Sequence, residues 1–72
     1  MARLPVVSGQ EAAKAFEKLG YVFRRKEGSH MIYKAPGKGT LSIPDHKELD
    51  KGLLRHLIAD AGTTPEEFRR LL

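Results

Sequence analysis

The stretch that decides the fold is residues 21–43, which read YVFRRKEGSHMIYKAPGKGTLSI. It contains three short runs of strand-forming residues, 21–26, 29–34 and 40–43. Glycine at position 28 and the Pro-Gly-Lys-Gly sequence at 36–39 separate the runs, and such residues are typical of tight turns. Because consecutive strands with short links usually pair with each other, the stretch predicts a three-stranded antiparallel sheet.

A helix is predicted immediately before this sheet, over residues 9–19. Ser8 and Glu11 have the spacing of a capping box, in which each satisfies the backbone N–H of the other. An apolar stripe of helical period follows, formed by Ala12, Phe16 and Leu19. Gly20 is placed to end the helix in a left-handed conformation.

Two further helices are predicted after the sheet. A polar connector, residues 45–50, leads to Asp50, which can cap a helix that Gly62 ends. Thr64 and Glu67 form a second capping box, with a short final helix behind it. The order is therefore α-β-β-β-α plus a short C-terminal helix, an α+β fold with helices on one face of the sheet. This topology resembles that of the double-stranded-RNA-binding domain.

The size and composition limit the class of protein. A chain of 72 residues has room for one small core, so we expect a single domain over residues 1–72. No apolar run approaches the roughly 20 residues needed to span a bilayer, and the first five residues lack the apolar stretch of a signal peptide. Without cysteine, the chain forms neither disulfides nor thiolate metal sites, which fits a reducing cytoplasm.

The positive charge is concentrated in the middle of the chain. Between positions 24 and 55 there are eight basic and four acidic residues, and this excess of four equals the whole net charge of +4. A polyanion such as nucleic acid is the partner that this distribution favours. The alternative is an ordinary solvated basic surface, which is common in small proteins.

The main candidate for chemistry is His30, which ends the motif Gly28-Ser29-His30 directly after three basic residues. Imidazole takes and gives protons near neutral pH, and the neighbouring cations attract phosphate. An RNA phosphodiester would use both properties. His30 can act as the base that takes a proton from the ribose 2′-hydroxyl, or as the acid that protonates the departing 5′-oxygen. The alternative is a structural strand histidine.

The candidates for RNA binding are the polar residues that surround this motif, Arg24, Arg25, Lys26, Ser29 and Lys34. Strict strand alternation would place Arg24 and Lys26 on one side of the sheet and Arg25 on the other.

The face that carries His30 depends on which neighbours are buried. If Met31 and Tyr33 are core, His30 and Lys34 share the open face; if Ile32 is core, His30 lies near a sheet edge. Tyr33 is either a core residue or a stacking platform for a base.

The chain has two other histidines, His46 and His56. His46, in the connector, can act as a second proton-transfer group or can tie the connector to the next helix. His56 is best explained as a surface or half-buried residue of the second predicted helix. The spacing of the three histidines fits no known local zinc pattern, and we expect neither a metal nor another cofactor.

Taken in order, several short motifs of this chain resemble the HicA family of bacterial toxins, the mRNA interferases of HicA/HicB toxin–antitoxin pairs. The motifs are Leu19-Gly20-Tyr21, Arg25, Gly28-Ser29-His30, Tyr33, Ile43-Pro44-Asp45-His46, Gly52-Leu53-Leu54, Ala61-Gly62 and Glu67-Phe68. Leu53 stands where the family commonly has a small or hydroxyl residue.

The resemblance implies a double-stranded-RNA-binding-like fold, cleavage of RNA with His30 as the catalytic residue, and neutralisation by a HicB-type antitoxin. The resulting prediction is a metal-independent endoribonuclease that acts on mRNA in the cytoplasm. Two alternatives remain at this point, a non-catalytic RNA-binding module of the same fold and a protein-interaction domain with an acidic partner.

Overall fold

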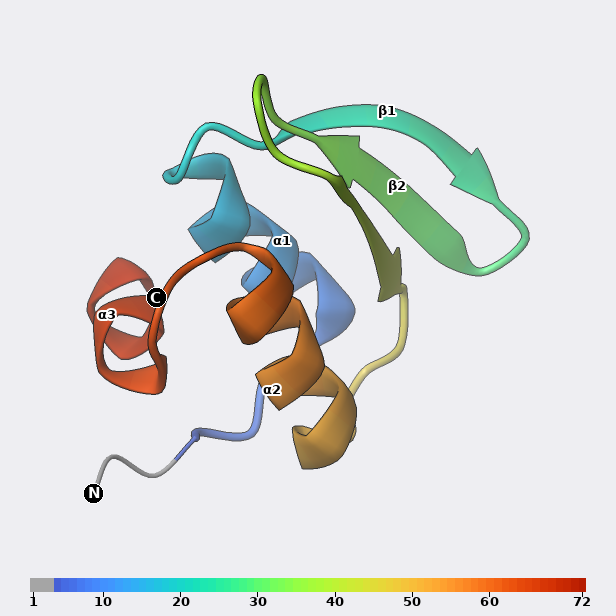
Figure 1. Ribbon diagram of the computed structural model, residues 1–72. Coiled ribbons are helices and arrows are strands. Elements are labelled where there is room, and N and C mark those ends of the chain that lie inside the picture. The colour runs from blue at the N-terminus through green and yellow to red at the C-terminus, as the bar shows by residue number, and fades with distance from the viewer. Residues whose placement is uncertain (1–3) are drawn as a thin grey trace.

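Three helices and three strands make up the fold in the computed structural model, which describes residues 4–72. In chain order they are α1 (Gly9–Glu17), β1 (Val22–Glu27), β2 (His30–Lys34), β3 (Thr40–Pro44), α2 (Lys51–Asp60) and α3 (Pro65–Leu71) (Figure 1). The predicted α+β order is confirmed. Element boundaries move by one or two residues, since α1 ends at Glu17 and β2 begins at His30. Residues 1–3, which belong to the predicted domain, lie outside the described residues.

Both ends of α1 are closed by hydrogen bonds that its sequence predicts. The Ser8 hydroxyl accepts from the Glu11 N–H at 3.0 Å, and the Glu11 carboxylate accepts from the Ser8 N–H at 2.9 Å. At the other end Gly20 has a φ of +99°, and the Tyr21 N–H reaches back to the Phe16 carbonyl. This left-handed turn ends the helix and directs the chain into β1.

The sheet is antiparallel in the order β1-β2-β3, so β2 is the central strand. Gly28 and Ser29 form a two-residue hairpin between β1 and β2, and only Gly28 has a positive φ, at +59°. A positive φ at the first turn position alone is the type II′ pattern. β1 is an edge strand whose six residues are all exposed. In Figure 1 the β1–β2 turn projects away from the helices.

The core lies between the sheet and the helices: α1 and α2 pack against one side of the sheet, and α3 packs against α1 and α2 (Figure 1). Met31 and Tyr33 of β2 belong to this core, as do Leu41 and Ile43 of β3. Their helical partners include a pair of aromatic rings, Phe16 and Phe68, with centroids 5.1 Å apart, and the aliphatic side chains of Leu54 and Ile58. Such burial of apolar surface on one face is the main favourable contribution to folding.

Met31 and Tyr33 belong to the core cluster beneath the helices, whereas Ile32, although only 7% exposed, does not, and this decides which face carries His30. Since side chains alternate along a strand, His30 and Lys34 lie on the opposite side of the sheet from the helices. We call this side the open face. Paired residues share a face, so the register assigns to it Val22, Arg25, Glu27, His30, Ile32, Lys34, Thr40, Ser42 and Pro44.

The connector between β3 and α2 is less polar and more closely packed than its sequence predicts. Leu49 is buried, and its N–H donates to the Val7 carbonyl at 2.8 Å. The first residue of α1, Gly9, donates its N–H to the His46 carbonyl at 2.9 Å. A Cβ on Gly9 would lie 1.9 Å from the Pro44 carbonyl oxygen. The backbone at the N-terminus of α1 therefore contacts the backbone of Pro44, the last residue of β3, and of the residues that follow it.

Within residues 4–72, none of the helices has the length and apolar character needed to cross a membrane.

Candidate functional site

His30 is the first residue of β2 and stands exposed on the open face of the sheet. Its position follows from the type II′ turn, which brings Glu27 of β1 opposite His30, while Pro44 of β3 lies opposite it on the other side. His30 is thus flanked by both neighbouring strands at the hairpin end of the sheet. An exposed imidazole in the central strand is open to a substrate that lies across the face.

The imidazole of His30 is held by Ser42 of β3. Its Nδ1 lies 3.2 Å from the Ser42 hydroxyl oxygen, and Nε2 has no hydrogen-bond partner among residues 4–72. A hydroxyl can donate to Nδ1 or accept from it, so either neutral tautomer can keep this contact. Ser42 therefore orients the ring and leaves Nε2 available for proton transfer.

A β-bulge at Arg24 changes which basic side chains share a face. The register passes from Phe23 opposite Tyr33 to Arg25 opposite Ile32, which leaves Arg24 out of the ladder. Strict alternation would have placed Phe23 and Arg25 on one face, whereas the bulge places Phe23 on the helix side and Arg25 on the open face.

The predicted grouping of Arg24 with Lys26 is therefore wrong. Arg24 lines a hollow with Val22 and Lys34 of the open face, while Lys26 lies opposite the core residue Met31. The physical reason is the extra residue, which shifts the alternation of β1 by one position.

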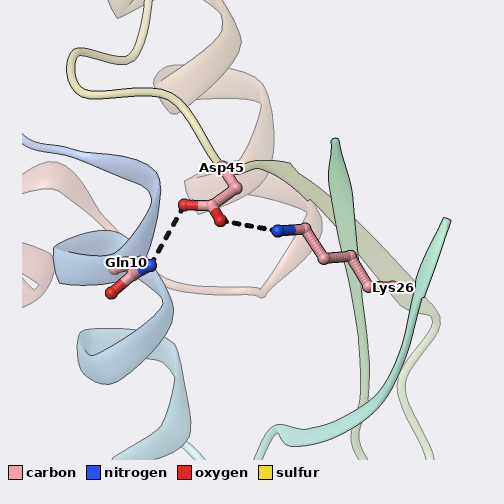
Figure 2. A network of polar contacts seen from close by, with 3 residues as sticks. All are labelled: Gln10, Lys26 and Asp45. Carbon is pink, nitrogen blue, oxygen red and sulfur yellow. Dashed lines mark hydrogen bonds and ion pairs between the residues drawn. The ribbon is translucent and has the colours of Figure 1, made fainter. Parts of the chain in front are cut away.

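Lys26 points towards the helices and binds Asp45. Its Nζ lies 2.8 Å from one carboxylate oxygen of Asp45, and the Gln10 amide donates to the other at 3.3 Å (Figure 2). The hydrogen bond from Lys26, followed by that from Gln10, holds the pKa of Asp45 below its usual value. Lys26 thus joins β1 to the connector and to α1, on the side of the sheet away from His30.

Arg25 is also paired, whereas Arg24 and Lys34 are not. The Arg25 guanidinium contacts the Glu27 carboxylate on the open face. Among the described residues, neither Arg24 nor Lys34 has an ion-pair partner, and both line one hollow with Val22, Ala35 and Pro36. The positive charge of the open face is therefore least neutralised near Lys34, at the end of β2 that is farther from His30.

The remaining predicted residues lie outside this arrangement or at its border. Ser29 is exposed in the hairpin turn, where its carbonyl accepts from the Asp45 N–H at 2.7 Å. His46 is exposed in the connector beside the N-terminus of α1, and no hydrogen bond within residues 4–72 joins it to His30. His56 is exposed in the middle of α2.

Tyr33 belongs to the core and does not serve as a platform on the open face. Its ring is buried against Phe23, with centroids 5.6 Å apart, and its hydroxyl donates to Glu17 at 3.4 Å. Burial and the Glu17 carboxylate raise the pKa of the Tyr33 phenol.

Three features of the site were not predicted: the Ser42 contact, the Asp45 contact and the bulge. Alternation in residues 40–43 places the side chain of Ser42 on the other face of the strand from the apolar Leu41 and Ile43, so the sequence alone predicts its face. Its meeting with His30 depends on the register between β2 and β3. Within residues 4–72, no three His, Cys, Asp or Glu side chains are grouped so that they could hold a metal ion.

Comparison with known families adds one match. The sequence model of the HicA toxin of bacterial toxin–antitoxin systems matches residues 9–63, a region that runs from the start of α1 to just beyond α2. No curated protein matches the chain significantly.

Proposed function

The chain belongs to the HicA toxin family, and from this premise we propose that it is an endoribonuclease that cleaves mRNA and is neutralised by a HicB-type antitoxin. The observation that carries the proposal is the placement of His30, exposed on the open face with its ring oriented by Ser42. Arg25 lies on the same face, where a guanidinium can stabilise negative charge on a phosphate.

The proposed reaction is an attack within the RNA strand. The 2′-oxygen bonds to the adjacent phosphorus as the bond to the 5′-oxygen breaks, giving a 2′,3′-cyclic phosphate and a 5′-hydroxyl. The 2′-hydroxyl loses its proton to a base, and the departing 5′-oxygen gains one from an acid. His30 Nε2 can fill either role, because imidazole exchanges protons near neutral pH. Positioned proton transfer of this kind contributes roughly 100- to 10,000-fold in rate.

We propose that this chemistry uses the chain's own side chains without a metal ion. The exposed cations of the site, Arg24, Arg25 and Lys34, would bind the RNA backbone, and the Ser29 hydroxyl would contact the phosphate near His30. Lys26 is the exception among the predicted RNA-binding residues, because its ammonium lies on the other side of the sheet, bound to Asp45, whereas Arg25, although paired with Glu27, lies on the open face.

The test is incubation of the purified protein with a long single-stranded RNA in excess EDTA, followed by end-group analysis of the products. Wild-type protein should leave cyclic phosphate ends, and His30→Ala should lose cleavage while keeping its fold. His56→Ala is the matched control, because this exposed histidine of α2 should be dispensable. Cleavage by His30→Ala at the wild-type rate would refute the mechanism. Activity that EDTA abolishes would refute its independence from metal.

The same experiment tests the alternative of a non-catalytic RNA-binding module. Intact RNA together with a salt-sensitive gel shift would favour that module, because phosphate contacts weaken steeply as salt rises. Failure to bind or cleave RNA would instead indicate a domain that docks on an acidic protein partner.

The proposed antitoxin would act by covering the open face. An acidic partner surface suits Arg24 and Lys34, which have no ion-pair partner among residues 4–72. The cytoplasm is where both mRNA and a protein partner would meet the toxin. Chemical modification of His30 with diethyl pyrocarbonate provides a test. Bound antitoxin should protect His30 more than His56, and equal modification of both histidines would contradict coverage of the site.

A further inference from the structure

A second feature of the open face is the hollow at the end of the sheet away from the hairpin. We call it the Arg24 hollow, and its lining comprises Val22, Arg24, Lys34, Ala35 and Pro36. Its floor is apolar and its two cations are unpaired within the described residues, whereas Arg25 and Lys26 each have a carboxylate partner. Unpaired cations beside apolar surface suit a ligand that has both an anionic and an apolar part.

The bulge is what brings Arg24 to this hollow. Without the extra residue, the register of Val22 and Phe23 would continue and Arg24 would pair opposite Ile32 in the middle of the strand. Bulges are often found beside functional sites, where they redirect a side chain. Arg24 instead stands next to Lys34, the last residue of β2.

The hollow and the proposed catalytic histidine lie at opposite ends of one strand. His30 and Lys34 are the first and last residues of β2 and face the same side. With a rise of about 3.3 Å per residue, the four steps from His30 to Lys34 span roughly 13 Å. Between them the open face holds Ile32 and its cross-strand neighbour Arg25. A single phosphate cannot span this length, but a strand of several nucleotides can.

We propose that the Arg24 hollow is a nucleotide subsite for the RNA strand that is cleaved at His30. Arg24 and Lys34 hold a phosphate there, and the exposed apolar side chains of Val22 and Pro36 contact the attached ribose and base. The RNA then runs along β2, over Ile32, from the subsite to the imidazole. The inference rests on the proposed function, since it assigns an additional contact of the same substrate. It makes the hollow a determinant of affinity and of minimal substrate length.

The first test measures RNA binding in the cleavage-deficient His30→Ala background, so that the substrate stays intact. Each of Arg24→Ala and Lys34→Ala should weaken binding of a single-stranded oligonucleotide by about two- to fivefold, the effect of losing one exposed ion pair. Each should also reduce the slope of log affinity against log salt, and loss of both cations together should reduce it by about 0.7, the value for one phosphate of a single strand. Arg55→Ala, which removes an exposed cation from α2, is the matched control and should change neither quantity.

A second pair of variants tests the floor of the hollow. Val22 is 57% exposed, so the fold should tolerate both Val22→Thr and Val22→Glu. A carboxylate at this position would repel the bound phosphate, so Val22→Glu should weaken binding more than Val22→Thr. Equal affinity of the two variants would contradict a phosphate in the hollow.

Cleavage assays with His30 intact separate this inference from the function on which it rests. If the Arg24 and Lys34 variants bind RNA more weakly and with a smaller salt dependence, but the wild-type protein cleaves no RNA, the subsite is supported and the proposed nuclease activity is refuted. If the wild-type protein cleaves RNA but the Arg24 and Lys34 variants bind it as tightly as Arg55→Ala does, the nuclease activity is supported and the subsite is refuted. A parent protein that binds no RNA would overturn the subsite directly.

Discussion

Replacement of Gly9 by alanine tests the contact between α1 and the chain that follows β3. The added methyl group would lie 1.9 Å from the Pro44 carbonyl oxygen, 2.9 Å from the Pro44 carbonyl carbon and 3.2 Å from the Asp45 Cα. All three atoms belong to the backbone, so no side-chain rotation relieves the clash. The helix and the connector must move apart by more than an ångström, since real Cβ contacts below 3.0 Å are essentially never observed.

The expected cost follows from three contributions. Overpacking of a close contact costs about 1–3 kcal/mol. Separation of the two segments also stretches the hydrogen bond from the Gly9 N–H to the His46 carbonyl, worth about 1 kcal/mol. Alanine regains at most about 1 kcal/mol through its higher helix propensity. We therefore expect Gly9→Ala to lower the free energy of unfolding by about 2 kcal/mol.

Urea denaturation followed by circular dichroism measures this change, and thermal unfolding should show a midpoint lower by about 8–16 °C for a domain of this size. Gly39→Ala is the control, because no atom lies within 4 Å of the added Cβ and φ there is not in the left-handed range. It should stay within about 0.5 kcal/mol of wild type or gain stability. A Gly9→Ala protein as stable as wild type would refute the close contact.

Three other predictions concern the polar groups of the fold and site. Lys26→Met should raise the pKa of Asp45 towards its ordinary value, as measured by NMR. Because the pKa of Asp45 is lower in the folded state, its ionised form stabilises the fold at pH values above the unfolded-state pKa, and this stabilisation is lost as the pH falls through the folded-state pKa. The variant should therefore lose less stability on acidification than wild type. An unchanged Asp45 titration would exclude the contact. Ser42→Ala should slow RNA cleavage several-fold with unchanged RNA affinity, and Ser42→Thr should restore the rate if the hydroxyl positions His30. Tyr21→Phe should leave the free energy of unfolding in urea unchanged or raise it by about 1 kcal/mol, because the buried Tyr21 hydroxyl has no hydrogen-bond partner within residues 4–72. A decrease of more than about 1 kcal/mol would show that the hydroxyl does form a hydrogen bond.

Local sequence patterns predicted the elements and their ends well. The side chains of Ser8, Asp50 and Thr64 each accept the backbone N–H three residues later, as predicted for capping residues. The second predicted capping box is only half formed within residues 4–72, because the Glu67 carboxylate accepts from Arg70 and not from the Thr64 N–H. Gly20 and Gly62 have the positive φ expected where helices end. These features depend on interactions between residues only a few positions apart, and such interactions are encoded in the spacing of residue types.

Contacts between distant segments were less predictable. Lys26 and Asp45 are 19 positions apart, and the choice of Asp45 over other carboxylates depends on the register of two hairpins and on the bulge. The bulge itself has no local signature in residues 21–27, which are rich in strand formers and basic residues. A shift of one residue reverses the face of every later side chain, so the basic cluster could not be divided between the two faces in advance.

The complete exposure of β1 has a consequence for the order in which the molecule opens. None of its six residues is buried, so separation of β1 from β2 gives up the contact of Phe23 with Tyr33 but leaves the packing of β2, β3 and the helices in place. Backbone amides of β1 should therefore exchange with deuterium through local fluctuations, well before those bonded between β2 and β3. Arg24 and Arg25 belong to this loosely held strand, whereas His30, Ser42 and Lys34 belong to the strands that open last. A partner that binds across the face would slow exchange most in β1 and would turn a fluctuating edge into an ordered part of the complex.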